Sequence, residues 1–363
     1  MFELVPPGTH IDFLGKRRLA AAISLGLILA AALAVGVRGV KWGIDFQGGS
    51  EVQIRMAPGV EASEGPIREV VTGCGVTEPS VVRYGGSTEF LIKFKSPSQE
   101  QLDATLANDN CPLNASERSE LQGMAEQGGG ADLTGQVVTR LQMALTRAIG
   151  PLEVDRVEFV GPRVGKELRE DGISALSIAC VLILIYVSFR FSTRFAPGAI
   201  VALVHDISIT AGIFVLLGLE FDLRVLAALL AILGYSLNDT IIIYDRIREN
   251  MELRTKHDLE DVLNRSVNQT LSRTILTSGT TMVAVLALLI LGGEMIRPFA
   301  QAMLIGIVVG TYSSIYIAAP TLLWLEQRAS RREAERAAAS QRSKGKPRAG
   351  SGSGKGKRAK ARA

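Results

Sequence analysis

Residues 223–250 read LRVLAALLAILGYSLNDTIIIYDRIREN, and this stretch decides the fold of the chain. Residues 223–244 are apolar over a length that can cross a bilayer, which takes about 20 residues at ~1.5 Å each. Inside this stretch stands a carboxylate, Asp239, between Asn238 and Thr240. An ionisable side chain at that depth costs at least about 2–3 kcal/mol and marks a functional position. The stretch therefore predicts a transmembrane helix and indicates Asp239 as its functional residue.

Five other stretches have the same apolar character. They lie near residues 19–39, 173–193, 196–218, 273–292 and 298–325. Of the 363 residues, 47% are hydrophobic and only 21% are charged, which is too apolar for an ordinary soluble chain. The first stretch is longer than the ~7–15 apolar residues of a signal peptide, so we interpret it as an uncleaved anchor. We expect six transmembrane helices, the first alone and the other five within residues 172–325.

Basic residues flank these spans unequally. On one side of the membrane the short flanking segments hold Lys16, Arg17, Arg18, Arg190, Arg194, Arg246, Arg248, Arg254, Lys256 and Arg265. On the other side the short turns hold only Arg224 and Arg297. Cytoplasmic loops carry the excess of Lys and Arg, so both termini, including residues 1–18, are expected in the cytoplasm.

Residues 40–171 have the composition of a soluble domain and are expected on the periplasmic side. They carry 13 Lys or Arg residues against 20 Asp or Glu residues, a net charge of −7. Alternating polar and apolar residues predict strands, and helical spacing predicts amphipathic helices. The expected strands cover 51–56, 88–94 and 154–160, a further strand is expected to start at 43–46, and the expected helices cover 66–71 and 135–149. This order suggests a small antiparallel α+β domain of the split βαβ kind.

Two features of this soluble segment stay open. Residues 108–130 are polar and end in three glycines, which predicts a flexible insertion. Cys74 and Cys111 can form a disulfide if the segment faces an oxidising compartment, or they can remain apart, because the sequence does not fix their separation. Cys180 lies in an apolar run and is interpreted as packing. The three cysteines show no metal-ligand spacing, so no metal is expected.

The C-terminal segment 326–363 is strongly basic and is predicted to be a disordered cytoplasmic tail. One interpretation is a solvated topological anchor. The other is attraction to anionic lipid or ribosomal RNA, worth about 1 kcal/mol for each basic residue near an anionic surface. A positive tail inside the cell is compatible with both.

Three spans carry polar or ionisable groups in their interiors. These groups are His205 with Asp206, Asp239, and Arg273 followed by Thr277, Thr280 and Thr281 on one helical face. We expect the polar faces to meet inside the bundle and Asp239 to pair with Arg273, so that rearrangement of the pair loads and unloads a proton. The alternatives are that Arg273 extends to the headgroups and that Asp206 with His205 forms a satisfied buried pair.

A charged string, Asp245, Arg246, Arg248, Glu249 and Asn250, follows the fourth span at its cytoplasmic exit. It has either a direct mechanistic role or the role of a solvated boundary with local ion pairs. No phosphate-binding glycine motif and no hydrolase motif occurs, so neither nucleotide binding nor a catalytic residue is expected.

Four strings together resemble the SecD/SecF family of protein-export membrane proteins, within the resistance-nodulation-division superfamily. They are Gly43-Ile44-Asp45-Phe46-Gln47-Gly48-Gly49, His205-Asp206, Gly234-Tyr235-Ser236-Leu237-Asn238-Asp239-Thr240 and Asp245-Arg246-Ile247-Arg248-Glu249-Asn250. The resemblance runs from about His10 to Leu325 and implies a six-helix half-bundle with one external domain. It marks Asp45, Phe46, Gly48 and Gly49 as the external motif, and the family's intramembrane aspartate and arginine fall on Asp239 and Arg273.

The resemblance also implies a function. It implies an inner-membrane complex with SecD, beside the SecYEG channel, that uses proton-motive force to assist export of preproteins; YajC and YidC are further partners it suggests. Such a subunit is not an enzyme and takes no cofactor, and SecD supplies a further carboxylate. Two alternatives remain: a structural subunit that stabilises the translocon without proton coupling, and a small exporter of the same superfamily.

Overall fold

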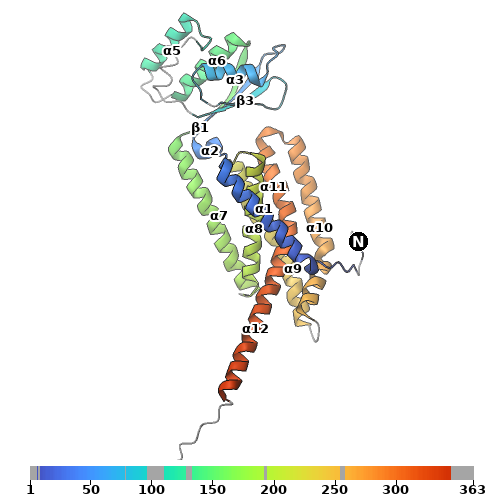
Figure 1. Ribbon diagram of the computed structural model, residues 1–363. Helices are drawn as coiled ribbons and strands as arrows, with labels where there is room; N and C mark the ends of the chain where they lie inside the picture. Colours follow the sequence, from blue (N-terminus) through green and yellow to red (C-terminus); the bar gives the residue numbers. More distant parts are fainter. Residues whose placement is uncertain are drawn as a thin grey trace, which may run out of the picture.

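The computed structural model shows a helical bundle with a small domain at one end and a long helix projecting from the other (Figure 1). It describes residues 6, 9–77, 79–95, 110–127, 133–191, 194–253 and 258–344. In these ranges six helices are long and apolar enough to cross a membrane. The expected membrane protein with six spans and one soluble domain is confirmed. Arg254, Lys256 and the tail from 345 onward lie outside the described residues.

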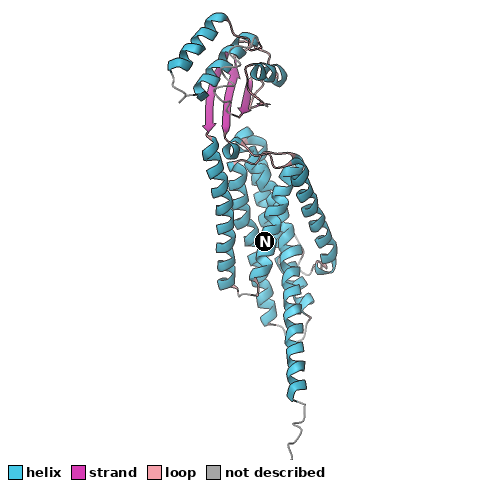
Figure 2. Ribbon diagram, turned by 60° about the vertical axis from the view of Figure 1, so that its left-hand side comes forward, coloured by secondary structure: helices cyan, strands magenta, loops and turns pink. Residues whose placement is uncertain are grey.

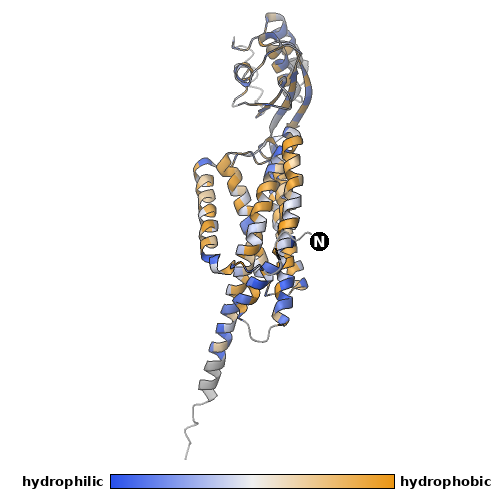
Figure 3. Ribbon diagram, turned by 90° about the vertical axis from the view of Figure 1, so that its right-hand side faces the viewer, coloured by the Kyte–Doolittle hydropathy of each residue, from blue (hydrophilic) through white to orange (hydrophobic). Residues whose placement is uncertain are grey.

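The spanning helices are connected by short turns except after the first. Their bounds are α1 (Arg17–Arg38), α7 (Pro162–Arg190), α8 (Ala196–Leu217), α9 (Leu223–Glu252), α10 (Leu259–Leu291) and α11 (Gly293–Ser313). A 3₁₀ turn, η1 (Leu14–Lys16), precedes α1, and a π-helical turn, η2 (Ser314–Ala318), joins α11 to α12 (Ala319–Lys344). Figure 3 shows the apolar residues on the spanning helices and polar residues along α12.

The centre of the bundle is made by α8, α9 and α11. Small residues on α11 let α9 approach closely, because a Cβ at Gly306 would overlap Ile232 and one at Gly310 would lie 3.0 Å from Ser236. Outer helices such as α7 expose large apolar side chains instead, among them Val181 and Leu182. The polar groups of the membrane are therefore gathered where α8, α9 and α11 meet.

The soluble domain contains a four-stranded antiparallel sheet in the order β2-β3-β1-β4. Figure 2 shows the strands beside the helices of this domain. Its elements are β1 (Gly49–Met56), α3 (Glu64–Gly73), β2 (Ser80–Arg83), β3 (Glu89–Phe94), α5 (Ala115–Gln127), α6 (Leu133–Ala148) and β4 (Leu152–Val160). Val52, Ile54 and Met56 of β1 share a core with Ile67 of α3 and Leu145 of α6. This is the split βαβ arrangement that the alternation of strands and helices predicted.

Three features differ from the sequence-based expectation. The Gly43–Phe46 segment, expected to begin a strand, forms the short helix α2 (Ile44–Gln47), because Gly48 and Gly49 turn the chain only after it. Strand β2 was missed, since four residues are too few to show alternation. The second spanning helix, α7, begins at Pro162 rather than near 173. Proline is favoured in the first turn of a helix, and the pairs Arg163–Glu167 and Lys166–Glu170 support the turns that follow.

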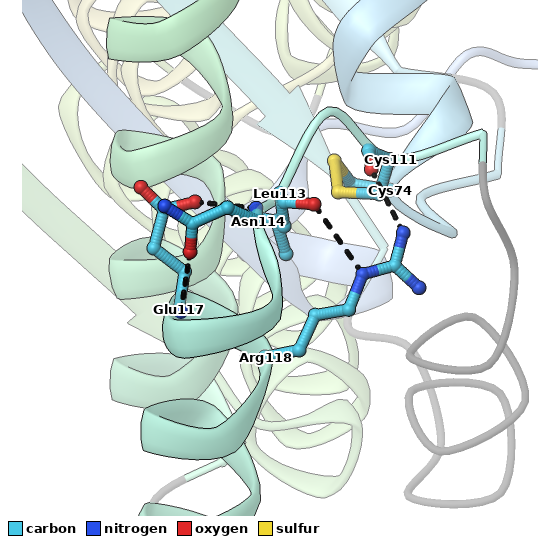
Figure 4. Close-up of a disulfide and its surroundings, with 6 residues drawn as sticks. All are labelled: Cys74, Cys111, Leu113, Asn114, Glu117 and Arg118. Carbon is cyan, nitrogen blue, oxygen red and sulfur yellow. Dashed lines mark hydrogen bonds between the residues drawn. A yellow bond between two sulfur atoms is a disulfide. The ribbon is translucent and has the colours of Figure 1, made fainter.

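The expected flexible insertion contains a helix held by a disulfide (Figure 4). Cys74 at the end of α3 is bonded to Cys111, so the open question is resolved in favour of pairing. Asn114 and Glu117 cap α5 reciprocally, each accepting the main-chain N–H of the other at 2.7 Å. Arg147 of α6 then contacts Glu117 at 3.1 Å. Residues 108–109 and 128–130 lie outside the described residues.

The prediction of disorder from residue 326 was wrong for the first part of the tail. Helix α12 continues to Lys344. Residues 326–336 are rich in Ala, Glu and Arg, which are strong helix formers that need no core to favour a helix attached to a spanning segment.

Candidate functional site

Asp239 lies in the centre of the bundle on α9 and is only 1% exposed. Its Oδ2 accepts a hydrogen bond from Ser278 Oγ of α10 at 3.2 Å. Ser278 in turn contacts Thr311 of α11 at 2.8 Å, so the carboxylate is linked to three helices. The other oxygen, Oδ1, is buried without a hydrogen-bond partner among the described residues. A buried charge with half of its acceptor capacity unused is costly.

Arg273 does not form the expected ion pair with Asp239. Among the described residues, no nitrogen of Arg273 lies within 4.0 Å of a carboxylate oxygen of Asp239, although Arg273 is near enough to act on Asp239 electrostatically. The reason is helix geometry: Ser278 follows Arg273 by five positions, about 140° around the helix, so Ser278 turns inward and Arg273 does not. Arg273 is exposed, together with Thr280 of the threonine face.

Asp206 of α8 forms a second buried polar cluster and is 0% exposed. Its Oδ2 accepts from Ser313 Oγ of α11 at 2.8 Å and from Ser236 Oγ of α9, and its Oδ1 lies 3.0 Å from His205 Nδ1. His205 Nε2 reaches Ser24 Oγ of α1 at 3.0 Å. Four helices therefore meet at a carboxylate whose two oxygens are both bonded, which is the satisfied arrangement left open by the sequence.

The neighbours of Asp239 face different environments. Thr240 is buried beside it, whereas Asn238 is on the exposed side of α9. Ser236, one turn earlier on α9, belongs to the Asp206 cluster. Ser236, Ser278 and Ser313 were missed from the sequence as site residues, because serine is common in packed membrane helices and its partners are distant in sequence.

The external motif holds the outer end of α9. Asp45 Oδ2 of α2 accepts the main-chain N–H of Leu223, the first residue of α9, at 2.9 Å. Asp222 caps the same end by accepting from Val225 N at 2.9 Å. A main-chain hydrogen bond, from Gly43 N to Phe221 O at 2.6 Å, lies beside these two. The first turn of a helix has free N–H groups, and here α2 supplies a partner for one of them.

The two glycines of the motif permit close backbone contacts with the next span. Gly48 has φ +79°, and a Cβ there would lie 2.7 Å from Cα of Pro162, the first residue of α7. Gly49 has φ +154°, and a Cβ there would lie 2.6 Å from the carbonyl oxygen of Phe94 in β3. Phe46 is buried, with its ring against Trp42. The motif thus joins the sheet to α7 and α9 through short backbone contacts.

A charged cavity of about 210 Å³ separates the sheet from the bundle beside this motif. Lys93 Nζ of β3 bonds Glu220 in the α8–α9 turn at 3.0 Å and lies 3.7 Å from Glu51 of β1. Burial raises the pKa of the Glu51 carboxyl above its usual value, although Lys93 opposes the shift. Glu51, Lys93 and Glu220 were not predicted as site residues, because nothing in the sequence around these charged residues indicates that they approach one another.

The charged string at the other end of α9 forms mostly local pairs. Arg246 bonds Glu249 at 2.9 Å, and Arg248 bonds Asp245 at 3.4 Å, as a solvated helix boundary does. Asn250 differs, because its side-chain amide reaches Ser266 and Gln269 of α10 at 2.9 and 2.8 Å. Asn250 therefore ties α9 to α10 below Asp239.

No group of three or more potential metal ligands occurs in the described part of the chain. The arrangement offers two intramembrane carboxylates, hydroxyl donors and a rigid link to an external domain. It is suited to the gain and loss of a proton and to movement of helices.

Comparison with known proteins assigns this arrangement to a family. Residues 141–328 match the family model described as "Protein export membrane protein SecD/SecF, C-terminal", and residues 33–60 match the "SecD/SecF GG Motif". The protein translocase subunit SecF of Vibrio alginolyticus is 38% identical over 90% of this chain and 93% of its own. That of Pseudomonas aeruginosa is 39% identical over 87% of this chain and 91% of its own.

Two solved SecDF structures show the same fold. SecDF from Thermus thermophilus superposes with a TM-score of 0.69 at 36% identity over 88% of this chain. SecDF in a "super-membrane-facing form" gives 0.61 at 35% identity over 93%. This chain spans only 39% and 41% of those longer chains, respectively. The chain belongs to the SecD/SecF family, as a homologue of the protein translocase subunit SecF.

Proposed function

We propose that this protein works with SecD as a proton-driven unit that assists export of preproteins through the SecYEG channel. In this proposal the soluble domain lies in the periplasm and both termini lie in the cytoplasm, as the basic residues around the spans indicate. The observation that carries the proposal is Asp239, a membrane carboxylate with one oxygen that lacks a hydrogen-bond partner among the described residues. It lies on a helix whose outer end is bonded to the external motif.

Proton binding at Asp239 changes the charge and the hydrogen bonding in the bundle core. The ionised carboxylate attracts the guanidinium of Arg273 and accepts from Ser278. The neutral acid has no net charge to balance and donates one hydrogen bond itself. The contacts between α9 and α10 therefore differ in the two states, and a proton moving across the membrane supplies about 2.3 kcal/mol per 100 mV to drive the change.

The external motif is the proposed route from the membrane to the exported chain. A shift of α9 acts on α2 through Asp45 and the main chain of Gly43, and α2 continues directly into β1 of the sheet. The contact of Gly48 with Pro162 links the same point to α7. Because these contacts are short, we expect a movement of the helices to move the soluble domain as well.

The exposed face of α10 is consistent with a partner protein beside it in the membrane. Arg273 and Thr280 point away from the bundle within a spanning helix, where a charged group is rarely left facing lipid. A carboxylate from SecD at this face would give Arg273 a counter-ion and complete the proton path.

The test is export of a secreted reporter in cells that depend on this chain. Asp239→Asn is expected to retain co-purification with SecD and to lose the part of export that depends on proton-motive force. Asp261→Asn, which removes an exposed carboxylate at the start of α10, is the matched control and should export normally. Loss of SecD from the Asp239→Asn preparation would instead favour the role of a structural subunit.

A further inference from the structure

A cavity of about 330 Å³ opens at the end of the bundle opposite the soluble domain, between the start of α1 and the start of α12. Its volume falls in the range of small-molecule sites. Its lining residues include Arg17, Arg18, Tyr316, Thr321, Trp324 and Gln327. None of these residues takes part in the Asp239 or Asp206 clusters, so the cavity is separate from the proposed proton site.

The two arginines at its rim are not equivalent. Arg17 forms an ion pair with Glu260 of α10 and also donates to Leu14 O, so its charge is already balanced. Arg18 is exposed and has no hydrogen-bond or ion-pair partner among the described residues. Arg18 therefore offers a free guanidinium, which matches a phosphate in planar geometry.

The residues beside the cavity are of the kinds that gather at a membrane surface. Leu322 and Leu323 are buried against the bundle, whereas the next residue, Trp324, is 54% exposed. The guanidinium of Arg328 lies 5.2 Å from the centre of the Trp324 ring. Tryptophan gathers at the boundary between lipid tails and headgroups, and arginine beside it reaches the headgroups.

The remaining lining residues are both polar and apolar. The hydroxyl of Thr321 and the amide of Gln327 can donate hydrogen bonds, whereas Ala21, Ile317 and Pro320 are apolar. The polar members suit an anion with oxygen acceptors, and the apolar members suit hydrocarbon. A basic pocket between spanning helices is the kind of site that holds an anionic lipid headgroup.

We propose that this cavity binds an anionic phospholipid, with its phosphate at Arg18 and an acyl chain along the wall next to Trp324. A lipid there would bridge α1 and α12, which are distant in sequence. The site needs neither proton coupling nor SecD, so it stands or falls independently of the proposed function.

The chain offers a direct probe, because its two tryptophans are Trp42 and Trp324. The full chain carrying Trp42→Phe is placed in nanodiscs of phosphatidylcholine, and quenching of Trp324 fluorescence is compared for brominated phosphatidylglycerol and brominated phosphatidylcholine. We expect phosphatidylglycerol to occupy the site about fivefold more strongly, the factor that corresponds to ~1 kcal/mol for one basic residue near an anionic group. Arg18→Gln should bring the two lipids close to parity, and Arg18→Lys should keep most of the preference.

The matched control is Arg332→Gln, which removes the same charge from the exposed side of α12 beyond the cavity. It should leave the preference unchanged. Equal quenching by the two lipids in the parent chain would overturn the proposal, as would an equal loss of preference in Arg18→Gln and Arg332→Gln. Absence of quenching by either lipid would also overturn it, since a protein segment would then cover Trp324.

Discussion

The carboxylate of Asp45, outside the membrane, accepts the main-chain N–H of Leu223 at 2.9 Å and so holds the first residue of the helix that carries Asp239. The external motif is thus bonded to the first residue of α9, and the intramembrane carboxylate lies further along the same helix. In the proposed function, a change at Asp239 reaches the soluble domain through this bond and the neighbouring backbone contacts.

Replacing Asp45 should therefore uncouple the domain from the membrane. Asp45→Ala is expected to lower proton-dependent export about tenfold, equivalent to ~1.4 kcal/mol of lost coupling, while destabilising the protein by only about 1 kcal/mol. Asp258→Ala removes a comparable cap at the start of α10, on the opposite side of the membrane. It should cost similar stability and leave export intact. Equal export in the two variants would exclude a coupling role for Asp45.

Gly48 is expected to be irreplaceable for a reason that Gly59 does not share. Both have positive φ, +79° and +90°, but a Cβ meets Pro162 only at Gly48 and finds open space at Gly59. Gly48→Ala should impair export and loosen the start of α7, measured by hydrogen exchange, whereas Gly59→Ala should show only the ~1 kcal/mol strain of its backbone. Matching defects would mean that backbone strain alone explains Gly48.

The Asp206 cluster should behave as a structural junction. Ser313→Ala removes a donor to the carboxylate, with an expected loss of about 0.6–2 kcal/mol in unfolding free energy. Ser314 is buried as well, but the one hydrogen bond that its hydroxyl forms among the described residues is to Thr311 O in the same helical run, so Ser314→Ala leaves no carboxylate without a donor and should cost less stability than Ser313→Ala. Thermal unfolding in detergent compares them. If the two variants unfold at the same temperature, the Asp206 cluster makes no measurable contribution to stability.

Glu51 should make the stability of the soluble domain depend on pH. Burial raises its pKa above 4.5, so the folded state holds the proton more tightly than the unfolded chain. Glu51 therefore favours folding below pH 4.5 and disfavours it as the pH rises through the raised pKa. Compared with Glu51→Gln, the wild type should lose stability progressively over this window. Glu69→Gln, at an exposed carboxylate, is the control. A pH-independent difference between wild type and Glu51→Gln contradicts the assignment.

Much of the fold was predictable because its signals are local. Apolar runs long enough for a bilayer marked the spans, and period-two alternation marked β1 and β3. Asp239 was recognisable because a carboxylate in such a run is expensive. The cap of α5 was also readable, since Asn114 and Glu117 have the spacing of a capping box, but the surrounding polar composition obscured it.

Other features depend on contacts that the local sequence does not contain. The rotation of α10, which turns Ser278 inward and Arg273 outward, follows from packing against α9 and α11. The bond from Lys93 to Glu220 joins two segments far apart in the chain, each polar in its own context. Helical periodicity identified a polar face on α10 but did not establish which face is buried.

The central claim is tested most directly by proton flux. The complex of this chain with SecD is reconstituted together with the SecYEG channel in vesicles that contain a pH-sensitive dye. Acidification is followed under a membrane potential while a preprotein engages the channel. The account predicts flux with the wild type and Asp261→Asn, and none with Asp239→Asn. Undiminished flux with an assembled Asp239→Asn complex would contradict it.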